Sequence, residues 1–395
     1  MKRRNFIIKS SMASMALTTS ALAMENAFNF KNANETLNIG VIGTGDRGSG
    51  LIHNIRSIDN MNVIGCCDIL PFRLEKGLKT SEGKAKGYND YRKLLDNKDI
   101  DAILVTTPLN THSNIAIDSL DAGKHVYCEK TMAKGYEGID NLVNKTNQYT
   151  NQIFQTGHQY HSSRLYTHIV ELIKQGKIGK ITSFDCQWNR NGNWRRPVPS
   201  PEYERIINWR MYREFSGGLV AELCSHQIDF VNWVLDETPT QVMGTGGIDY
   251  WKDGRETYDN IHLIYNYESG VKAKFTCLTS NAKDDYKIRV FGDKGSIVLD
   301  YTKAWFYPEN TGEKELGVVD GVSGATIQWE KGLGIPISVD HKEPSLQALI
   351  DFGNNIRDHK KPVSDITTGA NTAVCIQMGL DAMYKNEIVQ SPSFY

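Results

Sequence analysis

The strongest restriction on the fold comes from a short apolar run followed by three closely spaced glycines. Leu37–Ile42 is apolar and short, which is typical of a strand buried on both faces of a parallel sheet. Gly43, Gly45 and Gly48 follow in a Gly-x-Gly-x-x-Gly pattern. Glycines at this spacing allow a tight turn and close packing of the next helix on the strand. The segment therefore predicts a strand–turn–helix unit of an α/β fold.

A second short apolar run, Met61–Cys67, ends in Asp68, which lies 20 residues beyond Gly48. In such a unit the turn and the helix N-terminus bind a pyrophosphate, and the acid accepts hydrogen bonds from ribose hydroxyls. Because the carboxylate repels a 2′-phosphate, NAD is favoured over NADP, although the nearby Arg73 weakens that preference. The predicted NAD site comprises Asp68 and the turn residues Gly43, Thr44, Gly45, Asp46, Arg47 and Gly48.

Strands and helices alternate from residue 37 to about residue 156. Further buried-strand runs lie at residues 102–106 and 125–128. Helical stretches separate the runs, one starting near Arg47 and one over residues 114–122. This alternation predicts a doubly wound parallel sheet, a Rossmann domain, over residues 37–156.

The pattern changes from residue 157 onwards. A helix is predicted over residues 164–175, and two further helices, from Pro344 and from about Thr367, close the chain. Between them, short runs alternate apolar and polar residues and are separated by glycines. Residues 157–395 therefore predict a second, α+β domain whose sheet is mostly antiparallel. Its predicted strands are 181–188, 262–267, 271–279, 287–291 and 296–300.

Residues 1–23 are predicted to be an export signal. Four basic residues precede a run of apolar and small residues, which ends at a small-x-small cleavage site, Ala21-Leu22-Ala23. The pair Arg3-Arg4 resembles a twin-arginine signal, which predicts a periplasmic protein, and an ordinary secretory signal is the alternative. The apolar run is shorter than the ~20 residues that a membrane-spanning helix needs.

Charge and cysteine content argue against two classes of site. Removal of residues 1–23 takes away four positive charges and no negative ones, so the formal net charge falls from −1 to −5. Such a protein lacks the basic face that nucleic acids require, so no nucleic-acid partner is expected. The seven cysteines show no paired metal-ligand spacing and stand mostly among apolar neighbours. They predict buried thiols rather than a metal site.

Polar residues stand directly after two of the predicted Rossmann strands. Thr107 and Pro108 follow one strand, with His112 shortly beyond, and Glu129 and Lys130 follow the other. Because the carboxyl ends of parallel strands share the edge at which ligands bind, all five are predicted to bind the cofactor, Lys130 at its nicotinamide end. We expect Lys130 also to reach the reacting hydroxyl. A surface lysine that caps a strand is the alternative.

Glu222 and His226 lie four residues apart, shortly after the pair Gly217-Gly218. On an α-helix this spacing places both side chains on one face. A histidine beside a carboxylate can act as a general base whose tautomer is set by its partner. The spacing also suits a metal, but no companion ligands are found in the sequence. A histidine held inside a helix interface is the second alternative.

The order and spacing of these motifs, from residue 37 to the C-terminus, resemble the Gfo/Idh/MocA oxidoreductases. The resemblance implies NAD or NADP as cofactor, a second domain with a large open sheet, and a sugar or cyclitol as substrate. The motifs that carry it are the glycine fingerprint, Pro108 with His112, Glu129-Lys130, and Gly217-Gly218 with Glu222 and His226.

The resemblance also implies roles for three residues. Lys130 would lie beside the substrate hydroxyl and the nicotinamide, and His226 would take the hydroxyl proton. Glu222 would replace the usual aspartate partner and is one methylene longer. A second departure is Thr131, which stands where the family has a proline after the lysine.

A segment rich in tryptophan, arginine and proline lies between residues 188 and 213. Aromatic rings stack on the C–H faces of sugars, and arginines donate to hydroxyls or carboxylates, so this segment is predicted to bind substrate. An oligomer contact or a packed loop is the alternative. With Gln159 and His226, the predicted substrate-binding residues are Trp194, Arg195, Trp209 and Arg210.

Together these features predict an NAD-dependent oxidoreductase that transfers a hydride between a sugar hydroxyl carbon and nicotinamide. Because free NAD is scarce outside the cytosol, we expect the cofactor to be tightly held. One alternative is a glycoside hydrolase that oxidises its sugar transiently and eliminates the substituent. Another is a protein that binds NAD and sugar without turnover. An open sheet needs covering, so a homodimer or homotetramer is expected.

Overall fold

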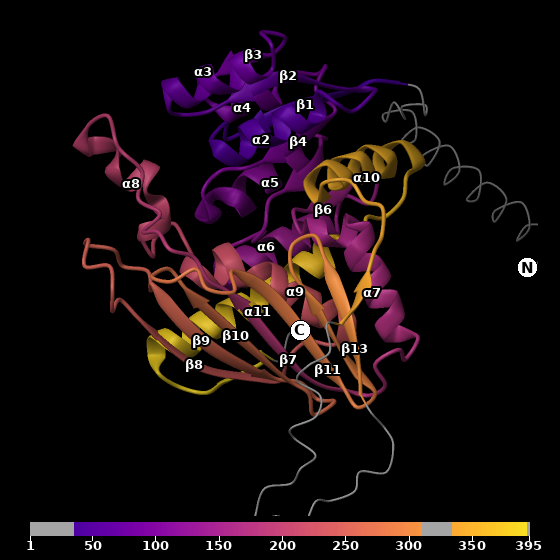
Figure 1. Cartoon of the computed structure of the whole chain (residues 1–395). Helices are drawn as coiled ribbons and strands as arrows, with labels where there is room; N and C mark the ends of the chain where they lie inside the picture. Colours follow the sequence, from indigo (N-terminus) through magenta and orange to yellow (C-terminus); the bar gives the residue numbers. More distant parts are fainter. Residues whose placement is uncertain (1–34, 310–333, 393–395) are drawn as a thin grey trace, which may run out of the picture.

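The computed structural model of the chain describes residues 35–309 and 334–392. The predicted export signal at residues 1–23 lies outside the described residues. Figure 1 shows two parts, a layered N-terminal part in indigo and magenta above a broad sheet in orange. Within the described ranges, the helices are all too short or too polar to cross a bilayer.

The N-terminal part is built on a six-stranded, wholly parallel sheet with the order β3-β2-β1-β4-β5-β6. The direction of winding reverses between β1 and β4, which makes their carboxyl ends a topological switch point. The predicted Rossmann domain is confirmed. Its strands are β1 (Leu37–Ile42), β2 (Met61–Cys67), β3 (Lys86–Tyr88), β4 (Ala102–Val105), β5 (His125–Cys128) and β6 (Phe154–Thr156), and its helices are α2 (Asp46–Ile55), α3 (Pro71–Thr80), α4 (Tyr91–Leu95), α5 (His112–Asp121) and α6 (Gly135–Thr146).

Helix α10 (Pro344–Asp358) comes late in the chain but packs on this first sheet. Its Leu349, Phe352 and Ile356 share one helix face and lie in the same apolar core as β1, β2 and α2. The ring of Phe352 meets Tyr127 of β5 edge to face, with centroids 5.7 Å apart. The C-terminal half of the chain therefore contributes a helix to the Rossmann core.

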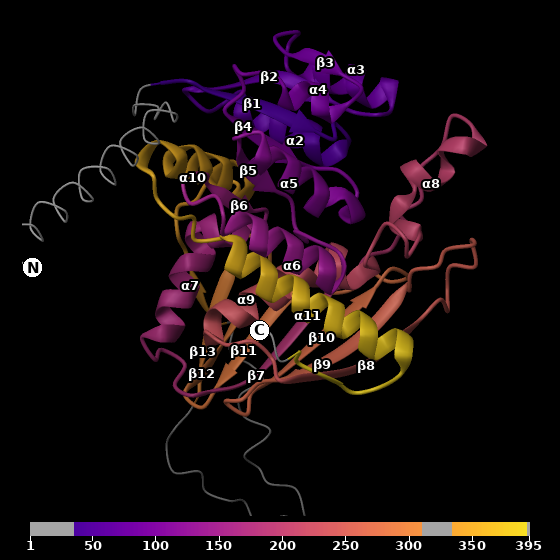
Figure 2. The same ribbon diagram turned by 180° about the vertical axis from the view of Figure 1, so that it is seen from behind.

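The second part is a nine-stranded sheet with the order β14-β13-β12-β11-β7-β10-β9-β8-β15. Only the pair β7–β10 is parallel among its described strands, so the prediction of a large, mostly antiparallel sheet is confirmed. Helices α7, α9 and α11 lie along one face (Figure 2). The strands are β7 (Ile181–Trp188), β8 (Gln241–Gly247), β9 (Asn260–Asn266), β10 (Lys272–Leu278), β11 (Tyr286–Gly292), β12 (Gly295–Leu299), β13 (Ala304–Pro308), β14 (Ile335–Ile337) and β15 (Val389–Gln390), and the helices are α7 (Arg164–Lys174), α9 (Ser225–Leu235) and α11 (Ile366–Lys385).

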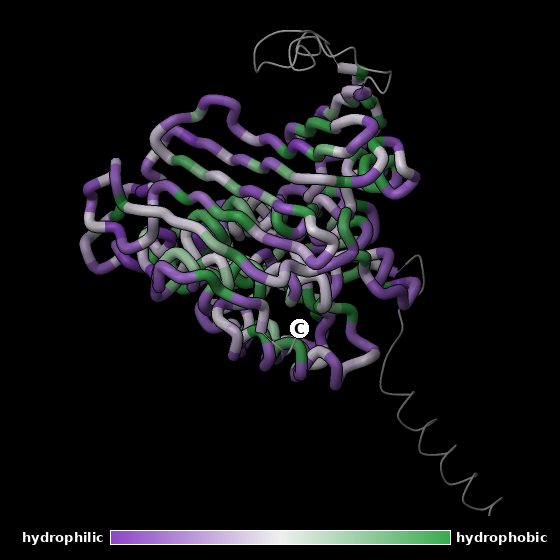
Figure 3. Tube along the Cα trace, turned by 90° about the horizontal axis from the view of Figure 1, so that it is seen from below, coloured by the Kyte–Doolittle hydropathy of each residue, from purple (hydrophilic) through white to green (hydrophobic). Residues whose placement is uncertain are grey.

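The opposite face of this sheet carries a mixture of polar and apolar side chains. Along β9 and β11 buried residues alternate with more exposed ones, and Figure 3 shows the two kinds of residue mixed along the strands. At its centre Asp185 lies between Lys274 and Arg289, 3.1 Å and 3.9 Å from their nitrogens. Exposed Met243 and Ile264 lie on neighbouring strands. The expected homo-oligomer stays a prediction.

Residues 189–215, here called the arm, leave the end of β7 and extend away from the sheet, with the short helix α8 (Glu204–Ile207) within them (Figure 1). The arm contacts the Rossmann part. Arg196 forms an ion pair of 3.3 Å with Asp46, the first residue of α2, and Tyr203 contacts Phe72 of α3 edge to face. The arm therefore bridges the two parts.

We expect Phe352→Ala to lower the free energy of unfolding by about 3–5 kcal/mol, because it empties a fully buried site in the Rossmann core. Urea unfolding followed by circular dichroism measures the change. Asn354→Ala, on the exposed face of the same helix, is the control and should change it by less than about 0.5 kcal/mol. Equal effects of the two substitutions would contradict the assignment of α10 to this core.

Candidate active site

The carboxyl ends of neighbouring parallel strands bring the predicted site residues together. The last residues of β1, β4, β5 and β6 lie side by side in register. The loops that follow these strands therefore emerge at one edge of the sheet, where α/β proteins bind ligands. They carry the glycine turn, Thr107 with Pro108, Glu129 with Lys130, and a histidine that was outside the predicted set, His158.

The structure accounts for glycine differently at each of the three positions in the turn. Gly43 has a φ of +94°, and a Cβ there would lie 2.7 Å from the carbonyl oxygen of Thr106. A Cβ on Gly48 would lie only 2.0 Å from the carbonyl oxygen of Gly43. Both are required by the fold itself. A Cβ on Gly45 would come no closer than 3.7 Å to any neighbour, the Arg73 guanidinium, so the fold leaves open space at this position.

The start of α2 fits a pyrophosphate. Gly45 caps the helix without a side-chain hydrogen bond, so the first backbone N–H groups lack the usual capping oxygen. Orphan N–H groups at a helix N-terminus attract anions. The open surface of Gly45 lets a phosphate approach this backbone closely. The residues present therefore suit the diphosphate of a dinucleotide.

Asp68 lies at the end of β2, as predicted. Its two carboxylate oxygens accept hydrogen bonds from the backbone N–H groups of Thr44, at 2.8 Å, and Leu70, at 2.9 Å. Burial raises the pKa of this carboxyl group, and the two backbone donors oppose the rise. Each oxygen keeps a second lone pair, so the group can also accept from ribose hydroxyls. Asp68 thus holds the glycine turn and faces the same ligand.

Arg47 and Glu129, predicted separately as cofactor contacts, form a close ion pair. Arg47 Nε and Nη2 both lie 2.7 Å from Glu129 Oε1, and Arg47 Nη1 donates to Ser345 Oγ at 3.0 Å. The buried Glu129 side chain is thereby neutralised. The pair joins α2, the loop after β5 and the start of α10. Sequence alone gave no sign of Ser345 at this site.

His112 is buried, and both of its ring nitrogens face backbone carbonyl oxygens. Nδ1 lies 2.8 Å from the oxygen of Thr131 and Nε2 lies 2.8 Å from the oxygen of Thr107. The imidazole therefore sets the spacing between the loops that follow β4 and β5. We had expected His112 to touch the cofactor. In the structure both of its ring nitrogens instead face the backbone of those loops.

Lys130 reaches from the Rossmann part to the second part. Its Nζ donates to the carbonyl oxygens of Ala221, at 3.1 Å, and Glu222, at 2.9 Å. These carbonyls belong to a π-helical turn, η5 (Val220–Cys224), which leads into α9. Burial lowers the pKa of Lys130, opposed by the two nearby glutamates. One of its three N–H groups remains for a ligand. The Lys130–Thr131 peptide bond is cis.

The predicted pairing of Glu222 with His226 needs correction. Residues 220–224 form a π-helical turn that leads into α9, and there Glu222 has another partner. Within the described residues no hydrogen bond or ion pair joins the two side chains. Glu222 instead accepts from Arg210 Nε at 2.7 Å. Burial opposes ionisation of Glu222, but the cations of Arg210 and Lys130 outweigh it and lower its pKa.

His226 lies in a pocket of rings at this same edge. The ring centroids of Tyr160, Trp188 and His158 are 5.2 Å, 6.0 Å and 6.1 Å from its own. Burial lowers the pKa of His226 well below its usual value, and the positive charge of Lys130 adds to the shift. His226 is therefore a neutral base at neutral pH. Among the described residues its buried Nδ1 has no hydrogen-bond partner.

The predicted substrate-binding residues have different surroundings in the structure. Arg195 pairs with Glu204 and Asp253, so its charge holds the arm together. Trp209 is buried, and the Arg210 guanidinium lies 4.3 Å from its ring centroid. Trp194 is partly exposed and has a φ of +62°, a strained conformation for a bulky side chain. Gln159 has a buried Oε1 without a partner among the described residues, beside the ring pocket.

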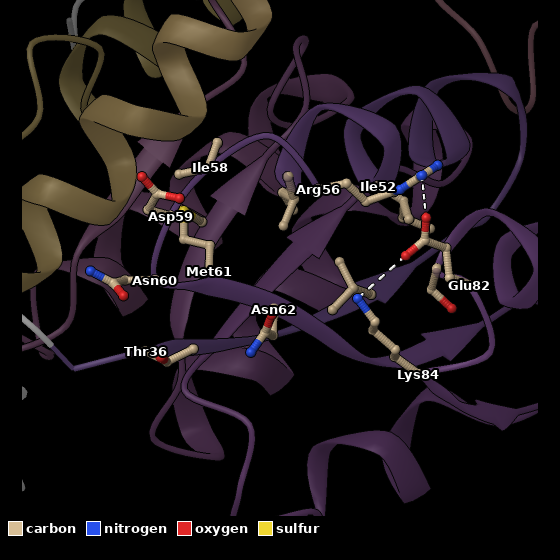
Figure 4. Close-up of a pocket in the computed structure, with 13 residues that line it drawn as sticks. Thr36, Ile52, Arg56, Ile58, Asp59, Asn60, Met61, Asn62, Glu82 and Lys84 are labelled. Atoms are coloured by element: carbon tan, nitrogen blue, oxygen red, sulfur yellow. Dashed lines mark hydrogen bonds and ion pairs between the residues drawn. The ribbon is translucent and has the colours of Figure 1, made fainter.

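Other candidate sites are absent or lie elsewhere. In the part of the chain that the structure describes, no group of three or more histidine, cysteine or acidic side chains could hold a metal ion. All seven cysteines are buried and free, as predicted. A cavity of about 340 Å³ lies between Thr36, the end of α2 and the start of β2 (Figure 4). It is at the opposite edge of the sheet from the glycine turn.

A Rossmann sheet, an open glycine turn, and a lysine and a neutral histidine at the same edge define a dinucleotide-dependent oxidoreductase. Comparison with protein families agrees. Residues 37–158 match the oxidoreductase family with an NAD-binding Rossmann fold, Gfo/Idh/MocA, and residues 166–298 match the C-terminal domain of the same family. The chain belongs to the Gfo/Idh/MocA oxidoreductases, and its cofactor is NAD.

Individual relatives are moderately similar to the chain in sequence. The chain is 28% identical over 279 residues to myo-inositol 2-dehydrogenase of Thermotoga maritima, covering 67% of this chain and 75% of that one. It is 25% identical to an inositol 2-dehydrogenase of Salmonella paratyphi B, spanning about half of each chain (51% and 55%). A levoglucosan dehydrogenase solved with NADH and levoglucosan superposes with a TM-score of 0.73 over 91% of this chain and 100% of its own; at 20% identity this shows the fold.

Two glycine substitutions separate binding from folding. Gly45→Ala should fold with nearly unchanged stability, because the added Cβ meets no close neighbour, yet release NAD more readily by obstructing the pyrophosphate. Gly48→Ala should lose about 1–3 kcal/mol of stability through overpacking. Urea unfolding and the nucleotide content of purified protein report the two effects. Undiminished nucleotide in a folded Gly45→Ala protein would place the dinucleotide elsewhere.

Stability should fall as the pH drops below about 6.5. Burial lowers the pKa of His158 and His226, and that of His125 to about 4, so the folded chain keeps these imidazoles neutral. The unfolded chain takes up protons below about pH 6.5, which favours unfolding. Urea midpoints at pH 8, 6.5 and 5 measure this effect. His125→Gln should flatten the slope, and a midpoint that stays constant down to pH 5 would contradict neutral burial.

Proposed function

We propose that this protein transfers a hydride between a hydroxyl-bearing ring carbon of a sugar or cyclitol and NAD. One observation carries the proposal. Lys130 and a neutral His226 lie together beside the carboxyl edge of the NAD-binding sheet, and the lysine charge acts on the histidine. A proton acceptor and a hydrogen-bond donor at that place are what alcohol oxidation requires.

The residues divide the work between them. NAD supplies the hydride acceptor when it is bound. His226 takes the hydroxyl proton, because its low pKa keeps the imidazole unprotonated at neutral pH. Lys130 uses its remaining N–H to hold the substrate oxygen, since its other two donors are fixed on the π-helical turn. Among the titratable groups around His226, Lys130 lowers its pKa most, and His158 and Arg47 act in the same direction.

Ring surfaces and an unpartnered polar atom support a polyhydroxylated ring as substrate. Tyr160 and Trp188 lie against His226, and aromatic rings pack on the C–H faces of sugars. Gln159 Oε1 is buried without a partner among the described residues, and a substrate hydroxyl would satisfy this acceptor. The names of the inositol and levoglucosan dehydrogenase relatives point to the same substrate class.

The proposal includes an exported enzyme with a firmly held cofactor. The signal-like residues 1–23 support export, and the arm supports retention of the cofactor. Arg196 of the arm pairs with Asp46 at the first turn of α2, next to the place where the pyrophosphate would lie. A homodimer or homotetramer, with the open sheet as its contact, belongs to the same proposal.

Nucleotide extraction followed by a substrate panel tests the function. Protein purified without added cofactor should release NAD on denaturation, detected by mass spectrometry. Incubation with inositols, free hexoses and aryl glycosides should give a keto product. Release of phenol without net oxidation would identify a hydrolase, and bound NAD with no product from any substrate would identify a binding protein. Absence of any nucleotide from folded protein would overturn the proposal.

Two substitutions should remove the chemistry and keep the cofactor. Lys130→Met and His226→Phe are each expected to lower kcat about 10²–10⁴-fold, the usual contribution of a positioned proton-transfer group. Nucleotide content should stay near that of the wild type. His53→Gln is the control, because His53 is exposed in the last turn of α2, at the end of the helix away from the glycine turn. Wild-type rates in both site variants would show that the reacting groups lie elsewhere.

A further inference from the structure

The catalytic base that we propose lacks the partner that would orient it. Glu222, which sequence analysis assigned to that role, is held by Arg210 on a turn of π-helix. A neutral imidazole has two tautomers, and only one presents a lone pair to a substrate hydroxyl through a given nitrogen. Some other group must fix the tautomer of His226. The following inference rests on the proposed function and identifies that group.

His158 is the nearest candidate. It follows β6 directly, so it emerges at the same sheet edge as Lys130, and its ring lies 6.1 Å from that of His226 at an angle of 81°. Both side chains are buried, with exposed fractions of 1% and 5%. His158 Nε2 and His226 Nδ1 are each buried without a hydrogen-bond partner among the described residues. Two buried nitrogens without partners, on neighbouring rings, suggest that one hydrogen-bonded contact joins them.

A chain of hydroxyl groups sets the tautomer of His158. Ser364 Oγ donates its proton to the backbone oxygen of Thr156 at 3.2 Å. Either hydroxyl could be the donor between Thr156 Oγ1 and Ser364 Oγ, which lie 2.5 Å apart; because Thr156 Oγ1 also lies 3.4 Å from the Ser364 backbone oxygen, we assign Thr156 as the donor to Ser364. Each hydroxyl has a single proton, so Thr156 Oγ1 can only accept from His158 Nδ1, 3.1 Å away. His158 therefore carries its proton on Nδ1 and presents a bare lone pair at Nε2.

We propose that His158 is the positioning residue for His226: its Nε2 accepts a hydrogen bond from Nδ1–H of His226 through one bridging water molecule, since ring centroids 6.1 Å apart leave the two nitrogens too far apart for a direct bond. This contact satisfies both orphan nitrogens at once. It leaves the proton of His226 on Nδ1 and the lone pair on Nε2, which is free to receive the substrate hydroxyl proton. Four side chains then act in series: Ser364, Thr156, His158 and His226.

The groups around His158 favour a neutral imidazole before His226 accepts a proton. Burial lowers its pKa, and the carboxylates of Asp229 and Glu129 oppose the cations of Lys130 and His161 around it. Asp229 is itself engaged, 2.9 Å from His161 Nε2 and 3.2 Å from Thr372 Oγ1. When His226 accepts a proton on Nε2, the added positive charge is shared across the hydrogen bond toward this carboxylate.

The tautomer of His226 is the direct test. Holoprotein labelled with ¹⁵N in its histidine rings distinguishes a bare ring nitrogen from a protonated one by NMR, without any turnover. We expect His226 and His158 of the wild type to be protonated at Nδ1. In His158→Leu, His226 should lose this preference, and in His158→Gln the amide oxygen should restore it. Thr156→Val should disturb both rings and serves as a second route if His158→Leu does not fold.

Kinetics provide the functional readout. His158→Leu should lower kcat at least about tenfold with little change in KM, and should shift the acid limb of the pH–rate profile, because the base loses its orientation and not its substrate contacts. His158→Gln should recover most of the rate. A merely structural role predicts lost stability with an unchanged pH profile.

The failure of the inference and of the proposed function are distinguishable. A wild-type His226 protonated at Nε2, or a tautomer unchanged in folded His158→Leu, would overturn the role of His158 even if the enzyme oxidises sugars. Conversely, absence of bound nucleotide and of any oxidised product would overturn the function whatever the tautomer.

Discussion

The active-site geometry depends on the parallel register of β1, β4, β5 and β6. In a parallel sheet all strands end at the same edge, so residues far apart in sequence arrive side by side. The glycine turn, the Arg47–Glu129 pair, Lys130 and His158 all follow from this register. Each follows the end of a hydrogen-bonded strand, so the sheet fixes the positions from which these side chains meet a ligand.

At this edge one ammonium group links the reacting residues of the two parts. Lys130 donates to two carbonyls of η5, and the same helical segment continues into α9 and carries His226. Carbonyl oxygens released by a π-helical turn need donors, and a buried ammonium supplies two. The contact therefore fixes the lysine and the histidine relative to each other, so that the reacting groups are assembled by the meeting of the two parts.

Sequence reasoning succeeded where the signal was local. The strand Met61–Cys67, the glycine turn and Asp68 stand where they were predicted, because burial of short strands and the need for glycine are both visible in a few consecutive residues. It failed for Glu222, because helical spacing gives no sign that Arg210 binds this carboxylate. It assigned His158 no chemical role, since its strand β6 is only three residues long and gives almost no periodic signal.

Local pattern thus determined the fold class, the dinucleotide turn and the types of reacting side chain, since backbone conformation and burial there depend on near neighbours. Long-range contacts decided the rest. Phe352 packs in the Rossmann core, and Arg210 binds Glu222. Buried nitrogens of His158 and His226 lie on neighbouring rings without other partners among the described residues. Such partners lie up to some three hundred residues apart in the chain, and only packing in three dimensions determines which polar group is left to satisfy which.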